Sequence, residues 1–109
     1  MNILHLTIKK EPFEVMVTGE KQEEYRSPTE WITSRLFDKD GNPKKFDRIR
    51  FTNGYNKKQP YFECKHINTR VHDNLLPDEY RAYENGLKVT IKGGDIIIEL
   101  GKVLKFRLG

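Results

Sequence analysis

Residues 46–108 contain several short runs that are typical of β-strands, and in some of them apolar and polar side chains alternate. In FDRIRFT (46–52), Ile49 and Phe51 share one parity and two arginines share the other. Because successive side chains of a β-strand point to opposite faces, this pattern predicts a strand with one buried face. Further strands are predicted at PYFECKHIN (60–68), LKVTIK (87–92), DIIIEL (95–100) and VLKFRL (103–108). A hairpin turn at Gly93-Gly94 is predicted to join the strands at 87–92 and 95–100. So many short strands favour a compact barrel or half-barrel over a doubly wound sheet.

The beginning of the chain predicts one more strand and a short helix. ILHLTI (3–8) alternates in the same way as the runs above. EPFEVMVTG (11–19) has an apolar stripe at helical spacing, with Pro12 suited to the first helical position. Gly19 suits the position just after the helix, where a left-handed backbone is common.

A second helix is predicted within SPTEWITSRLF (27–37), with Ser27 as its N-cap and Glu30 completing a capping box. LPDEYRAYENG (76–86) reads as a short helix or an irregular excursion. Together these segments predict an α+β, mainly β fold, a small β-barrel of about six strands with two or three short flanking helices. The length fits a single domain over residues 1–109.

Positive charge is concentrated in one part of the chain. Residues 41–72 contain eight of the 20 Lys/Arg but only two of the 16 Asp/Glu, in a chain whose net charge is +4. A concentrated basic block indicates a polyanionic partner better than a high isoelectric point does. Aromatic residues interleave with the basic ones, and this combination suits single-stranded RNA. The predicted contact residues of this block are Arg48, Arg50, Asn53, Tyr55, Lys57 and Lys58. The alternative is a set of ordinary lysine-rich solvated turns.

The segment GEKQEEYR (19–26) is highly charged although it follows a hydrophobic run. As a strand it would place Gln22, Glu24 and Arg26 on one face and Lys21, Glu23 and Tyr25 on the other. One interpretation is a solvated edge strand whose charges discourage aggregation. The other is a strand that lines a cleft, because it lies between two predicted helices. A carboxylate held beside a lysine and an arginine could then serve as a general base, orient a substrate amide, or fix the basic side chains.

The spacing Gly19-x-Lys21-x-x-Glu24-x-Arg26 resembles the G-x-K-x-x-E-x-R signature of the ASCH domain family, within the PUA-like superfamily. Similarity to its small, phage-associated branch extends over most of the chain, through LHLTIKK, WITSRLF, KKFDRIRFTNGY and IIIELGKV. The resemblance implies a PUA-like β-barrel with helices packed around it. It also implies a cleft that carries Lys21, Glu24 and Arg26 and binds RNA or a modified nucleoside.

Some ASCH proteins are ribonucleases and others are amidohydrolases that deacetylate N4-acetylcytidine. In the amidohydrolases a lysine, a threonine and a distant glutamate carry the reaction, and Lys21 matches the lysine. Glu24 stands where the threonine would be, so this chain has no hydroxyl nucleophile at that position. Glu79 and Glu84 lie in the region of the distant glutamate. The hydrolase alternative therefore assigns catalysis to Lys21 and Glu24.

Other features bound the remaining possibilities. The single cysteine excludes an intramolecular disulfide and favours a reducing compartment, so a cytoplasmic location is expected. Cys64 and His66 share a strand parity but form no Cys-x-x-Cys or His-x-x-x-His motif, so neither a metal nor a cofactor is predicted. No apolar run is long enough to cross a membrane, and no membrane partner is expected. A protein-interaction module is the third functional alternative, and the oligomeric state is left open.

Overall fold

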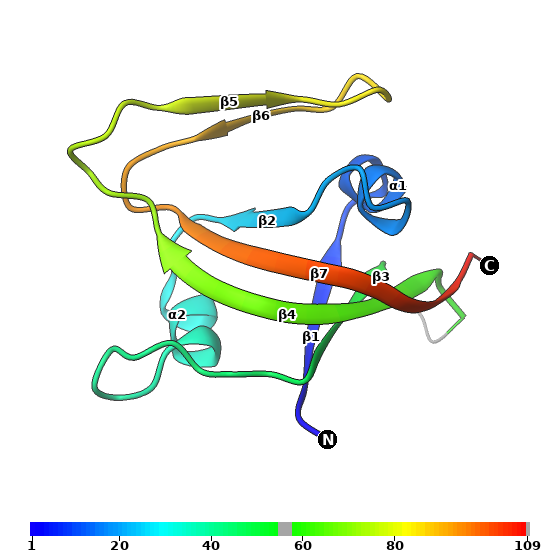
Figure 1. Ribbon diagram of the computed structural model, residues 1–109, viewed down its shortest axis with the longest axis horizontal. Coiled ribbons are helices and arrows are strands. Elements are labelled where there is room, and N and C mark those ends of the chain that lie inside the picture. Colours follow the sequence, from blue (N-terminus) through cyan, green and yellow to red (C-terminus); the bar gives the residue numbers. More distant parts are fainter. Residues whose placement is uncertain (55–57, 109) are drawn as a thin grey trace.

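The computed structural model describes residues 1–54 and 58–108 (Figure 1). It has two short helices and seven strands in this part of the chain, which confirms the mainly β, α+β fold. In chain order the elements are β1 (Ile3–Ile8), α1 (Lys10–Val17), β2 (Glu23–Arg26), α2 (Glu30–Leu36), β3 (Arg48–Asn53), β4 (Tyr61–Val71), β5 (Glu79–Ala82), β6 (Lys88–Ile91) and β7 (Ile96–Arg107).

Five strands form one curved sheet in the order β1-β3-β4-β7-β2, and β1 and β3 are the parallel pair. The inner face of this half-barrel carries the core, which the alternation of the sequence predicted. Leu4 and Leu6 of β1 lie beside Ile49 and Phe51 of β3, and all four are buried. The two helices complete the core with apolar side chains, which are Phe13 and Met16 from α1 and Ile32 and Leu36 from α2.

The edge strands of the half-barrel, β1 and β2, are linked by a side chain. Arg26 of β2 donates from Nη2 to the carbonyl oxygen of Thr7 in β1 at 3.0 Å. Because β2 otherwise pairs only with β7 among the described strands, this bond bridges the side on which the barrel is open. Arg26 therefore contacts both edges of the half-barrel.

Strands β5 and β6 form a separate antiparallel hairpin that extends beyond β2 in Figure 1. Its turn is attached to the first half of the chain by two hydrogen bonds. The amide of Glu84 donates to Glu20 at 3.0 Å, and the side chain of Asn85 donates to the carbonyl of Glu11 at 2.9 Å. The turn of the hairpin is thus bonded to the first turn of α1 and to the segment that follows this helix.

This hairpin corrects two predictions from the sequence. Residues 76–86 contain strand β5 where a helix or an excursion was predicted. The turn at Gly93-Gly94 joins β6 to β7, but these strands belong to different sheets and form no hairpin with each other. Both corrections follow from the pairing of β6 with β5 in place of β7. The alternation within a single run does not reveal which strands pair.

The N-terminus of α2 is capped two residues later than predicted. Thr29 is the N-cap, and its hydroxyl accepts from the amide of Ile32 at 3.2 Å. Ser27 lies before the helix, because Thr29 still has an extended backbone and the helix begins at Glu30. In α1, similarly, the helix begins at Lys10, two residues before Pro12.

Removing this cap is expected to lower the free energy of unfolding. Thr29→Ala leaves the amide of Ile32 without its side-chain acceptor, and we expect a loss of about 1 kcal/mol in urea unfolding. Ser27→Ala is the matched control and should change stability by less than about 0.5 kcal/mol. Equal losses in the two variants would contradict the assignment of Thr29 as the cap.

Candidate functional site

The structure brings Lys21, Glu24 and Arg26 together at a cleft of about 800 Å³. The cleft lies between the edge strands β1 and β2, the N-terminal end of α1, the end of β3 and the β5–β6 hairpin. Its lining residues are Thr7, Ile8, Lys9, Lys10, Glu11, Pro12, Lys21, Glu24, Tyr25, Arg26, Asn53, Gly54, Leu87 and Val89. Asn53 is thus a further predicted site residue that reaches the same cleft.

Strand pairing explains why Glu24 and Arg26 point inward. They lie opposite Ile98 and Ile96 of β7, and both isoleucines are buried in the core. Lys21 precedes β2, so the alternation of the strand does not determine its direction. The chain turns at Gly19, whose φ is +86°, and the Lys21 amide then donates to the carbonyl of Val15 at 2.8 Å. This turn directs the lysine side chain to the same side as Glu24.

Glu24 is the centre of the charged group. Its side chain is only 8% exposed and lies between two cations. One carboxylate oxygen, Oε1, is 3.5 Å from Nζ of Lys21, and the other, Oε2, accepts from Nε of Arg26 at 3.0 Å. The carboxylate therefore fixes both basic side chains relative to β2.

Lys21 is almost fully enclosed, with 2% of its side chain exposed. Its ammonium donates to the carbonyl of Glu23 and to Glu24, and it lies 4.7 Å from the centre of the Tyr25 ring. Burial lowers the pKa of Lys21, and the charge of Glu24 opposes that shift. Arg26 is more exposed, at 25% of its side chain, so it is the member of the group that a bound molecule would contact most readily.

The predicted basic residues do not all reach this cleft. Arg48 and Arg50 lie on the opposite face of β3, where both pair with Glu63. A small ligand in the cleft cannot contact them, because the buried layer of Ile49 and Phe51 lies between. Lys58 lies in an exposed turn before β4, and Tyr55 and Lys57 lie outside the described residues.

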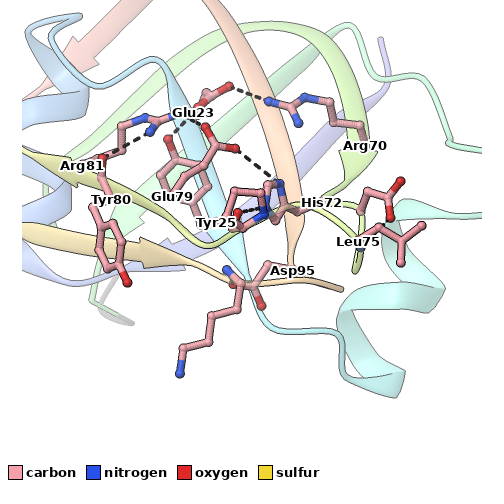
Figure 2. A network of polar contacts seen from close by, with 12 residues as sticks. Glu23, Tyr25, Arg70, His72, Leu75, Glu79, Tyr80, Arg81 and Asp95 are labelled. Carbon is pink, nitrogen blue, oxygen red and sulfur yellow. Dashed lines mark hydrogen bonds and ion pairs between the residues drawn. The ribbon is translucent and has the colours of Figure 1, made fainter.

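Neither candidate for a distant glutamate lines the cleft. Glu79 of β5 pairs with Arg81 at 2.9 Å and faces the buried ring of His72 at 3.4 Å (Figure 2). Glu84 lies in the exposed turn of the hairpin. The hairpin instead contributes Leu87 and Val89, two apolar residues that the sequence did not single out. No local sequence pattern predicts Leu87 and Val89 as lining residues, because they reach the cleft through the position of the hairpin.

A polar network on the other face of β2 attaches the walls of the cleft to the rest of the molecule. The hydroxyl of Tyr25 donates to Glu23 at 2.6 Å, and Glu23 pairs with Arg70 of β4 at 3.3 Å (Figure 2). Burial and the bond to Glu23 raise the pKa of the Tyr25 phenol. Tyr25 therefore belongs both to the lining of the cleft and to this network, through the bond that its hydroxyl donates to Glu23.

His72 is a second element of this network, at the base of the hairpin. Its backbone bonds to residues 94 and 95 at 2.8 Å each, and its Nε2 lies 3.0 Å from the carbonyl oxygen of Pro77 (Figure 2). These contacts fix the segment that leads from β4 into β5. His72 thus holds the base of the hairpin that carries Leu87 and Val89, while the bonds of Glu84 and Asn85 hold its turn.

Comparisons with known proteins give no family assignment. No family model, curated protein or solved structure significantly matches this chain. Within residues 1–54 and 58–108, no cluster of three His, Cys, Asp or Glu side chains is placed to hold a metal ion. No helix in the described part of the chain is long and apolar enough to cross a membrane.

Proposed function

We propose that the cleft binds one nucleoside, either within a single-stranded RNA or as a free modified nucleoside. The observation that carries this proposal is the convergence of Lys21, Glu24 and Arg26 at a cleft of about 800 Å³. This volume lies in the range of small-molecule sites, which combine apolar walls with a few fixed polar groups. The resemblance of residues 19–26 to the ASCH signature supports the same class of ligand.

The chemistry of the walls suits a base. Ile8, Leu87 and Val89 are apolar members of the lining, and Tyr25 is an aromatic one. Glu24 accepts hydrogen bonds, Arg26 donates them, and the Asn53 amide can do both. Such groups distinguish base edges by their pattern of donors and acceptors. A base amino group would meet the carboxylate, and a base carbonyl or a phosphate would meet the guanidinium.

We propose binding in preference to hydrolysis. The Lys21 amine is enclosed and engaged by Glu23 and Glu24, so a substrate would have to displace these contacts to reach it. Glu24 is paired on both oxygens, and neither Glu79 nor Glu84 lines the cleft. The charged group thus resembles a fixed recognition surface more than an exposed nucleophile with its base.

Loss of the Arg26 guanidinium is expected to weaken nucleoside binding at least about tenfold, the equivalent of one charged hydrogen bond. Calorimetric titration with the four ribonucleosides and N4-acetylcytidine should show this for Arg26→Gln. Arg35→Gln is the matched control, since Arg35 is exposed in the last turn of α2 and lies outside the cleft lining, and it should bind like the wild type. Equal affinity in Arg26→Gln and wild type, or release of acetate from N4-acetylcytidine, would contradict the proposal.

A further inference from the structure

A second charged surface lies on the face of β3, β4 and β7 opposite the core. Strand pairing arranges it in rows: Arg48 beside Lys65, then Arg50, Glu63 and Lys105, then Thr52, Tyr61 and Arg107. We call the surface formed by Arg48, Arg50, Tyr61, Lys65, Lys105 and Arg107 the outer basic face. These rows contain five cationic side chains and one carboxylate. The basic block of the sequence thus forms one side of the sheet together with residues from the end of the chain.

Glu63 organises the two arginines of this surface. Its side chain is 2% exposed, and its two oxygens accept from Arg48 at 3.2 Å and from Arg50 at 2.7 Å. Burial would raise the pKa of Glu63, but the bonds from Arg50 and Arg48 outweigh it and hold that pKa below its usual value. The guanidinium groups remain about a third exposed, at 30% and 32% of their side chains. The two arginines are therefore fixed by the buried Glu63 carboxylate and remain accessible to solvent.

Tyr61 connects the cations of neighbouring strands. Arg50 lies 4.2 Å from its ring centre, Arg107 lies 5.0 Å from it, and Lys105 lies 5.9 Å from it. Such contacts hold a cation over an aromatic ring and restrict its rotamers. Cationic groups whose positions are already restricted lose less entropy when they bind a phosphate. The outer basic face is thus preorganised for anions spaced along a surface.

We propose that the outer basic face binds the phosphate backbone of a single-stranded nucleic acid. The rows hold more cations than carboxylates, and such a balance favours a polyanionic partner. Fixed guanidinium groups match phosphate oxygens in pairs, and their planes also allow bases to stack. An anionic membrane would not need this planar arrangement, and the rows contain no large aliphatic side chain to insert into one.

This surface is separate from the cleft, so the inference does not rest on the proposed function. Ile49 and Phe51 lie between the two, and they are fully buried. Thr52 belongs to the outer rows, whereas the next residue, Asn53, lines the cleft. Variants of either surface can therefore be made without touching the other.

The test measures how binding depends on salt. The probe is a fluorescent oligouridylate of about 12 nucleotides, a length that small single-strand-binding domains cover. The variant Lys65→Gln/Lys105→Gln removes two exposed cations and keeps both arginines that bond to Glu63. Because two fewer phosphates are then neutralised, the slope of log K against log salt should become shallower by about 1.4. Lys39→Gln/Lys92→Gln removes the same charge from exposed positions elsewhere and should leave the slope unchanged.

Several outcomes would overturn the inference. One is no binding of the oligouridylate at micromolar protein. Another is a salt slope that is unchanged in Lys65→Gln/Lys105→Gln. A third is loss of oligouridylate binding in Arg26→Gln alone, which would assign the binding to the cleft and not to the outer basic face. Binding to phosphatidylserine vesicles but not to the oligouridylate would assign the surface to membranes instead.

Discussion

Glu24→Gln is expected to lower the free energy of unfolding by about 3–5 kcal/mol near neutral pH, the cost of leaving a buried charge without its partner. The variant keeps the shape of the side chain but removes the charge that lies 3.5 Å from the Lys21 ammonium. Lys21 is 2% exposed, so water cannot replace the missing carboxylate. Urea unfolding followed by circular dichroism measures the change.

Two further measurements separate this cause from simple loss of packing. Lys21→Met/Glu24→Gln should recover at least about 1 kcal/mol relative to Glu24→Gln, because it removes the unpaired charge.

The loss of unfolding free energy in Glu24→Gln should also become smaller toward about pH 10. Burial lowers the pKa of Lys21 in the folded protein, so the folded state loses this proton first as pH rises. Glu14→Gln, on the exposed side of α1, is the control and should change stability by less than about 0.5 kcal/mol. A defect that is independent of pH would contradict the charge-based explanation.

Glu63→Gln is expected to lower the free energy of unfolding by about 2–3 kcal/mol near neutral pH, since it removes two charged hydrogen bonds to a buried carboxylate. The arginine bonds hold the pKa of Glu63 below its usual value in the folded protein. A carboxyl group with a depressed folded pKa contributes its stability above the unfolded pKa, about 4.3, and loses it as pH falls through the folded value.

The stability difference between wild type and Glu63→Gln should therefore disappear in strong acid. Unfolding in urea at neutral pH and near pH 2 measures it. Glu30→Gln serves as the control, because Glu30 is exposed in the first turn of α2. If Glu63→Gln were equally destabilising at both pH values, the ion pairs with Arg48 and Arg50 would not be the source of the stability.

The alternation of single strands predicted the core well. In residues 46–52 it separated Ile49 and Phe51, which are buried, from Arg48 and Arg50, which lie on the outer face. It also placed Glu24 and Arg26 on one face of their strand, which β2 confirms. These predictions succeeded because side-chain direction within a strand is a local property of the backbone.

The relative positions of separate segments were not accessible in this way. The arginines of β3 and the charged group of β2 were expected to serve one ligand, but they lie on opposite sides of the sheet. Lys21 faces Glu24 because the backbone turns at Gly19, where strand parity does not yet apply. Leu87 and Val89 line the cleft because the β5–β6 hairpin extends beside β2, more than sixty residues away in sequence. Each of these facts depends on long-range pairing, which no single segment encodes.

The most direct test of the cleft is a map of nucleoside contacts by backbone amide NMR. Titration of the labelled protein with the tightest-binding nucleoside should shift the amides that surround the cleft. These are the amides of Tyr25, Arg26, Asn53, Gly54, Leu87 and Val89. The amides of Lys65 and Lys105 on the outer basic face should stay in place. Shifts confined to the outer basic face, or no shifts at millimolar nucleoside, would contradict the proposal that the Lys21–Glu24–Arg26 cleft is the nucleoside site.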